Sequence, residues 1–199
     1  MRIIGITGGV GAGKSTVLAF LEKEYGAAVI QADQVGHLVM EPGEECYEDV
    51  IGIFGKEIIK EDKTIDRKRV SDVVFEQPHL LKMLESVIHP AVKRYICRRI
   101  RELQESGCRL CVVEAALLLE EHYQDFCDQV WYIHTDPQIR IRRLEESRGY
   151  TREKAEGIIA SQATEEYFRA HTDYVIENNN DLDRTYAQIR ERIEKHAVL

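Results

Sequence analysis

A glycine-rich loop near the start of the chain constrains the fold more than any other feature. Eight residues fit the pattern G-x-x-x-x-G-K-[ST], with Thr16 next: Gly8, Gly9, Val10, Gly11, Ala12, Gly13, Lys14 and Ser15. Such glycines let successive backbone N–H groups point into one concavity, and the following helix adds partial positive charge. The pattern predicts a nucleotide triphosphate cradle, with Lys14 on the β- and γ-phosphates and Ser15 on Mg²⁺.

Short apolar runs along the chain are continuous and β-branched, which is typical of buried parallel strands. They span residues 2–7, 28–31, 110–114, 130–134 and 174–177. A helical pattern at residues 15–25 directly follows the glycine-rich loop. The alternation predicts an α/β fold, a P-loop kinase-type parallel sheet of about five strands flanked by helices.

The second and third strands are separated by about eighty residues, which is too long for an ordinary connection and indicates a helical insertion. Its clearest helix spans residues 78–105, where Pro90 is expected to kink or break it. An arginine-rich helical stretch (139–168) and a closing amphipathic helix (182–196) follow. These patterns predict three parts: a core (1–36, 109–138 and 170–199), a helical domain (37–108) and a lid (139–169).

The overall charge excludes some classes of function. The chain has 35 Asp and Glu against 27 Lys and Arg, a net charge of -8, which disfavours non-specific nucleic-acid binding. No apolar stretch approaches a membrane span. The odd number of cysteines, five, favours free thiols and a cytoplasmic protein, and we interpret Cys108 and Cys111 as an accidental C-x-x-C pair.

Two carboxylates follow predicted strands, at the sheet edge where α/β folds bind ligands. Asp33 follows the second strand and is either a general base for an acceptor hydroxyl or the N-cap of a helix, with equal weight on each. Glu114 ends the third strand and either holds a water on Mg²⁺ or is structural, although Asp is more usual in that role.

The arginine-rich stretch supplies candidate cations. Residues 140–169 contain seven basic and six acidic side chains, a net +1 within an acidic chain. A solvated helix would look similar, but phosphoryl transfer needs cations around the transferred group, and Arg143 and Arg148 are the favoured candidates. No Asn-Lys-x-Asp segment, as in base-selective GTPases, is present. His89 precedes Pro90 and marks a helix break more readily than a catalytic base, with a polar role toward substrate left open.

With these residues placed, nearly the whole chain resembles the dephospho-CoA kinase family. Beyond the glycine-rich loop, the matching blocks are Ala32-Asp33 with His37, Ile65-Asp66-Arg67, Ile88-His89-Pro90, Leu117-Leu118-Leu119-Glu120, Arg143-Leu144 with Arg148-Gly149, Gln162, and Asp173 to Asn178. The resemblance implies Mg²⁺- and ATP-dependent phosphorylation of the ribose 3′-hydroxyl of dephospho-CoA, the last step of coenzyme A biosynthesis. ATP and dephospho-CoA are then the partners, and the helical domain receives the CoA precursor.

The resemblance also implies residue roles. Asp33 becomes the favoured base, Lys14 and Arg143 stabilise charge, Arg148 joins the ATP site, and His37, Arg67 and His89 contact substrate. Two departures stand out, because the family often has Asp-Ala-Asp where this chain has Gln31-Ala32-Asp33, and Asp-x-Pro-Leu-Leu at Glu114 to Leu118. The second departure puts Glu114 in doubt as a metal group. A nucleoside monophosphate or shikimate-type kinase, and a nucleotide-dependent switch, remain alternatives.

Overall fold

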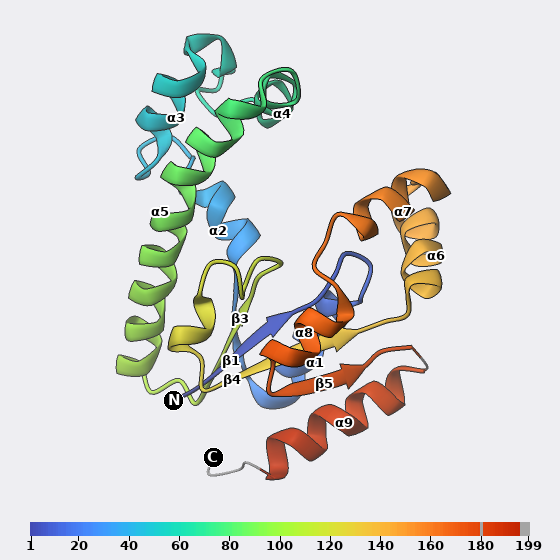
Figure 1. Ribbon diagram of the computed structural model, residues 1–199. Helices are drawn as coiled ribbons and strands as arrows, with labels where there is room; N and C mark the ends of the chain where they lie inside the picture. Colours follow the sequence, from blue (N-terminus) through green and yellow to red (C-terminus); the bar gives the residue numbers. More distant parts are fainter. Residues whose placement is uncertain (180, 196–199) are drawn as a thin grey trace. The chain divides into compact units, whose positions relative to one another are not determined.

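A computed structural model describes residues 1–179 and 181–195. Within them, five strands form one sheet in the order β2-β3-β1-β4-β5 (Figure 1). Their bounds are β1 (Arg2–Thr7), β2 (Ala28–Gln31), β3 (Leu110–Glu114), β4 (Gln129–His134) and β5 (Tyr174–Glu177). The pairs β1–β3, β1–β4 and β4–β5 are parallel, with Ile6 opposite Glu114 and Trp131. The predicted α/β fold is confirmed, and β4 begins one residue earlier than expected.

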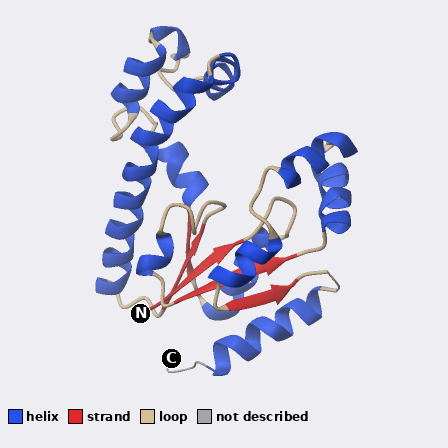
Figure 2. Cartoon of the chain, viewed as in Figure 1, coloured by secondary structure: helices blue, strands red, loops and turns tan. Residues whose placement is uncertain are grey.

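Helices account for most of the remaining chain (Figure 2). Their bounds are α1 (Lys14–Tyr25), α2 (Ala32–Leu38), α3 (Tyr47–Phe54), α4 (Arg67–Glu76), α5 (Pro78–Glu105), α6 (Pro137–Arg148), α7 (Arg152–Ala160), α8 (Glu165–His171) and α9 (Leu182–Lys195), with short 3-10 turns at Lys56–Ile58 and Tyr123–Phe126. The arginine-rich stretch is therefore three helices. Position 196 of the predicted closing helix lies outside the described residues.

The sheet carries its main core on one face. Ile4 and Ile6 of β1 and Trp131 and Ile133 of β4 are fully buried there against α1 and α9. On the other face, Tyr132 stacks on Phe168 of α8, with ring centroids 4.7 Å apart. Because successive residues of β4 point to opposite faces of the sheet, the strand packs against α8 on one side and α1 on the other.

The chain divides into two compact units, which we call the sheet unit (Met1–Ile30 with Glu102–Leu199) and the helical unit (Gln31–Arg101). The arginine-bearing helices α6 and α7 lie within the sheet unit and share a small core of Ile141, Leu144 and Ala155, against which Val10 packs. The division into core, helical domain and lid at the predicted boundaries remains a prediction.

Two alternatives that the sequence left open are excluded. Pro90 does not break the long helix, because α5 continues through it from Pro78 to Glu105. Packing supports the turn after the proline, where Ala91 and Val92 are buried. Asp33 is not an N-cap either. The helix α2 begins at Ala32 with Gln31 as its cap, so Asp33 lies inside the first turn. There its negative charge interacts favourably with the partial positive charge of the helix N-terminus.

Candidate nucleotide-binding site

The glycine-rich loop, residues 8–13, joins β1 to α1 and is shaped by contacts that leave no room for side chains. Gly13 has a φ of 85°, and a Cβ there would collide with the amide of Asn178. A Cβ on Gly9 would likewise collide with the guanidinium of Arg140. In the described part of the chain, the N–H groups of Gly13, Lys14 and Ser15 have no hydrogen-bond acceptor. These N–H groups at the start of α1 therefore form a ready site for phosphate oxygens.

Lys14 is held at the mouth of this loop by two oxygens. Its ammonium donates a hydrogen bond to the carbonyl of Gly8 at 2.9 Å and lies 3.4 Å from Oε1 of Glu114. Glu114 is 6% exposed, so its carboxylate keeps the lysine in place from the end of the neighbouring strand β3. The structure thus brings together two of the predicted site residues, and Glu114 contacts the lysine that is expected to meet the phosphates.

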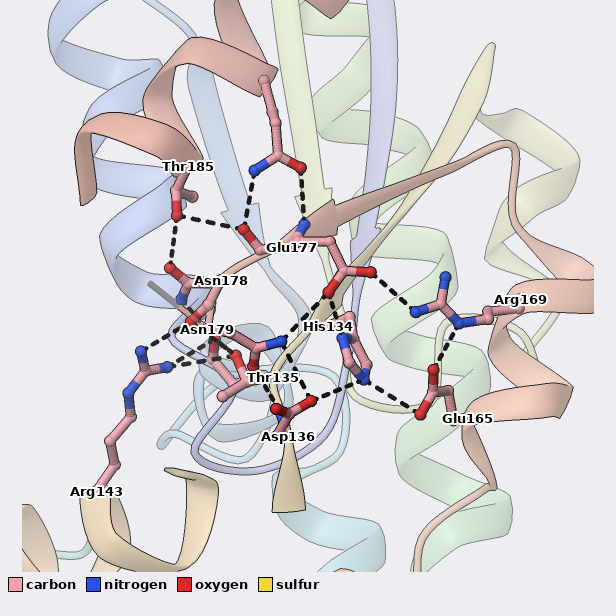
Figure 3. A network of polar contacts seen from close by, with 12 residues as sticks. His134, Thr135, Asp136, Arg143, Glu165, Arg169, Glu177, Asn178, Asn179 and Thr185 are labelled. Carbon is pink, nitrogen blue, oxygen red and sulfur yellow. Dashed lines mark hydrogen bonds and ion pairs between the residues drawn. The ribbon is translucent and has the colours of Figure 1, made fainter. Parts of the chain in front are cut away.

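Arg143 extends from α6 to the loop, where its guanidinium hydrogen-bonds to uncharged oxygen atoms (Figure 3). Its guanidinium donates to the carbonyl of Asn178 at 2.9 Å and to the carbonyl of Ala12 at 3.3 Å. Thr135 and Asn178 also donate to that Ala12 carbonyl, at 3.0 and 2.8 Å. Among the described residues no carboxylate pairs with Arg143, so its positive charge is uncompensated beside the phosphate cradle. Burial lowers the pKa of Arg143, and the guanidinium stays charged.

A second arginine, Arg140, is the site residue that sequence reasoning missed. It is 9% exposed, donates to the carbonyl of Val10 at 2.8 Å and binds Gln162 Oε1, which also accepts the N–H of Val10 at 3.1 Å. Burial lowers the pKa of Arg140, and no carboxylate in the described part of the chain pairs with it. The available signal was its spacing: Arg140 and Arg143 are three residues apart and so share one helix face.

The other predicted nucleotide residues are less engaged. Ser15 is exposed at the start of α1, and the N–H of Thr16 bonds to the carbonyl of Gly13 at 3.1 Å. Arg148 is exposed in the last turn of α6, and within the described residues no hydrogen bond joins it to the loop. The structure therefore groups Arg143, and not Arg148, with the phosphate loop.

The helical unit carries the remaining candidates. Asp33 and His37 are both exposed on α2, four residues apart, and Arg67 is exposed at the start of α4. Burial lowers the pKa of His37; the charge of Arg67 lowers it further, and that of Asp33 opposes the shift. These three residues thus act on one another electrostatically. His89 lies half-buried within α5.

The donors present fit a kinase-type Mg²⁺ site. Within the described residues no cluster of three or more His, Cys, Asp or Glu could enclose a metal ion. A Mg²⁺ that keeps several waters and binds substrate phosphates needs only one or two protein oxygens. The Ser15 hydroxyl at the start of α1, beside the free N–H groups, is such an oxygen.

A parallel sheet, a phosphate loop after β1, Lys14 at the start of the next helix and two guanidiniums without a carboxylate partner among the described residues together characterise a P-loop nucleotide-binding protein. The chain belongs to the dephospho-CoA kinase family, whose model matches residues 2–184. Membership of this family makes it an enzyme of coenzyme A biosynthesis that uses ATP to phosphorylate dephospho-CoA. In the described residues, no helix combines the length and apolar character needed to cross a membrane.

Individual relatives agree with this assignment. The chain is 37% identical to a dephospho-CoA kinase of Geobacter sulfurreducens, covering 98% of this chain and 96% of the relative. It is 35% identical to that of Corynebacterium diphtheriae, with 100% and 98% covered. A crystal structure of a Thermus thermophilus protein superposes with a TM-score of 0.82 at 28% identity, covering 98% of both chains. The fold is also shared with a shikimate kinase of Acinetobacter baumannii (TM-score 0.52, 17% identity, 100% and 96% covered).

Proposed function

We propose that the chain transfers the γ-phosphoryl group of Mg²⁺-bound ATP to the ribose 3′-hydroxyl of dephospho-CoA, with the sheet unit holding ATP. The observation that carries this proposal is the pair Arg140 and Arg143: both guanidiniums lie on the loop residues without a carboxylate partner among the described residues. Burying a charge without a counter-ion is costly, and the triphosphate is the anion that relieves that cost.

The loop residues divide the work of binding. The free N–H groups of Gly13, Lys14 and Ser15 would bind phosphate oxygens, and Lys14 would move from Glu114 to the β- and γ-phosphates. Ser15 would hold Mg²⁺, which would supply positive charge to neutralise the phosphates, and Glu114 is the second group proposed for that metal, through a water. Arg143 would stabilise the charge of the transferring group, and Arg148 would reach ATP from the end of α6.

On the acceptor side, Asp33 is the proposed general base. It is an exposed carboxylate two residues after β2, inside the first turn of α2, and it is free of the capping role that the sequence also permitted. Its task would be to accept the proton of the attacking 3′-hydroxyl and to orient that oxygen for in-line attack. His37, Arg67 and His89 are proposed substrate contacts, with the cation of Arg67 suited to the phosphates of dephospho-CoA.

An acceptor panel tests the proposal. Purified protein with ATP and Mg²⁺ is offered dephospho-CoA, AMP, CMP or shikimate, and ADP release is measured together with acceptor phosphorylation by mass spectrometry. We expect acceptor-stimulated turnover with dephospho-CoA alone, lost in EDTA and restored by Mg²⁺. Turnover with AMP, CMP or shikimate instead would reassign the acceptor. Tight nucleotide binding without stimulation by any acceptor would indicate a nucleotide switch.

A further inference from the structure

Four charged side chains form a closed ring on the side of the sheet that faces α8 (Figure 3). Nδ1 of His134 lies 2.6 Å from Oε2 of Glu177, and its Nε2 lies 3.2 Å from Oε2 of Glu165. Arg169 closes the ring: it donates to Oε1 of Glu165 at 2.6 Å and to Oε1 of Glu177 at 2.9 Å. We call these four residues the charge ring. They come from the end of β4, the end of β5 and both turns of α8.

The donors and acceptors of the charge ring limit its possible protonation states to two. Both ring nitrogens face carboxylate oxygens, whereas a neutral imidazole carries a single N–H. Each carboxylate already accepts from Arg169 through its other oxygen. A neutral His134 would therefore direct one nitrogen lone pair at a carboxylate oxygen, so the geometry requires either an imidazolium or a protonated carboxyl group.

The surroundings favour the imidazolium. The groups that face His134 are Asp136, whose Oδ1 lies 3.9 Å from Nε2, Glu165 and Glu177, and the ring of Tyr132 at 5.7 Å. The hydrogen bond from Arg169 is the main cause that lowers the pKa of Glu165. Burial alone would raise the pKa of Glu177, but hydrogen bonds from Arg169 and His134 lower it overall. Both carboxyl groups thus stay ionised, and His134, 6% exposed, carries the proton.

The next residue along each strand belongs to the nucleotide site. Thr135 follows His134, and Asn178 follows Glu177; the side chains of both donate to the carbonyl of Ala12 in the phosphate loop. The N–H of Asn178 bonds to the carbonyl of His134 at 2.8 Å, which extends the ladder between the two strands past their ends. At the ends of these two paired strands, a charge-ring residue is therefore followed directly by a residue that contacts the phosphate loop.

We propose that His134 is a positioning residue of the nucleotide site: as an imidazolium it completes the charge ring, which ties α8 to the ends of β4 and β5 and holds Thr135 and Asn178 against the phosphate loop. With the proton, the charges of His134, Arg169, Glu165 and Glu177 cancel. Without it, one negative charge remains uncompensated beside Asp136, and His134 no longer donates to both Glu165 of α8 and Glu177 of β5. This inference rests on the proposed ATP site and not on the identity of the acceptor.

Nuclear magnetic resonance of the intact protein tests the protonation directly. A long-range ¹H–¹⁵N correlation spectrum resolves both ring nitrogens of each histidine, and His134→Gln identifies the signals of His134 among the seven histidines. Because each ring nitrogen faces a carboxylate oxygen, we expect both nitrogens of His134 to carry protons at about pH 7. A neutral tautomer at that pH would overturn the proposal, whatever the catalytic result.

Calorimetric titration with Mg²⁺-ATP tests the positioning role without requiring turnover. His134→Gln should raise the Kd for ATP about fivefold at about pH 7, because a neutral glutamine cannot supply the positive charge that completes the charge ring.

Two controls separate positioning from a general loss of structure. His171→Gln changes an exposed histidine of α8 outside the charge ring, and Glu166→Gln changes the exposed carboxylate next to Glu165. Both should keep the wild-type Kd for ATP. A Kd in His134→Gln no higher than the Kd in these controls would refute the role. An ATP Kd too weak to measure in the wild type would instead refute the proposed ATP site.

Discussion

The sheet unit and the helical unit hold their functional side chains in different ways. In the sheet unit, the single carbonyl of Ala12 accepts three hydrogen bonds, from Thr135, Asn178 and Arg143. Lys14 is held by the carbonyl of Gly8 and the carboxylate of Glu114. In the helical unit, Asp33, His37 and Arg67 are exposed, and the links among them are electrostatic. In the proposed scheme, one unit presents a site that is already assembled, and the other presents side chains that a ligand must still order.

This difference has a physical consequence for catalysis. Donors fixed before the reaction stabilise developing charge without reorganising, which is the larger contribution in phosphoryl transfer. Side chains that become ordered only on binding cost conformational entropy at that moment, so they contribute more to selection of the acceptor than to affinity. Substitutions in the sheet unit should therefore change stability and nucleotide binding together, whereas those in the helical unit should change turnover with stability preserved.

The largest effect is expected at Lys14. Lys14→Ala should lower kcat/KM on the order of 10²–10³-fold, because the substitution removes a preorganised cation from the transferring phosphates. It should also lower the thermal unfolding midpoint, since the buried carboxylate of Glu114 loses a cation at 3.4 Å. Steady-state kinetics and scanning calorimetry measure the two effects.

A paired variant sharpens this prediction. Lys14→Met combined with Glu114→Gln removes both charges and should restore the unfolding midpoint while activity stays lost. Recovery of activity in the double variant would show that Lys14 serves mainly to neutralise Glu114. The contrast between an assembled and an unassembled site would then no longer hold.

The same contrast explains how far the sequence could predict this molecule. The phosphate loop is contiguous, so glycine spacing and flanking strand patterns were sufficient to place Gly8 to Ser15 and the five described strands. Arg140 contacts Val10 across 130 positions, and the charge ring joins residues up to 43 apart. The spacing of Arg140 from Arg143 indicates a shared helix face, but no local pattern predicts either of these long-range contacts. Short-range signals left two roles open at Asp33, because a carboxylate after a strand suits both a helix cap and the first helical turn. The helix α2 begins two residues earlier than a cap at Asp33 would place it.

The next effect in size tests the helical unit. Asp33→Asn should lower kcat about a hundredfold, as for removal of a positioned base, with little change in the Kd for ATP or in the unfolding midpoint. Asp49→Asn is the matched control, because Asp49 is also exposed in the first turn of a helix, α3, of the same unit. Both substitutions weaken a favourable interaction with a helix dipole equally, so a difference in turnover isolates the chemical role. Equal turnover in the two variants would remove Asp33 as the base.

The smallest expected effect is on the rate at which cysteines are labelled. One buried thiol in each unit reports how often that unit opens. Burial raises the pKa of Cys127 in the sheet unit to about 12, and its sulfur packs over the position where Gly5 has no side chain. In the helical unit Cys46 is 1% exposed, burial likewise raises its pKa, and its thiol donates to the carbonyl of Val87 at 3.6 Å. Neither thiol should react with iodoacetamide at about pH 8 unless its unit opens locally.

ATP should slow the labelling of one cysteine and not the other. At about ten times its Kd, a ligand that binds only the closed sheet unit lowers the open population about tenfold, so Cys127 should label about tenfold more slowly, measured by mass spectrometry of the alkylated peptides. Labelling of Cys46 should change less than about twofold, because the helical unit does not bind ATP in the proposed scheme. Equal slowing of both thiols would mean that the two units open as one, and the exposed acceptor residues would then share the stability of the assembled nucleotide site.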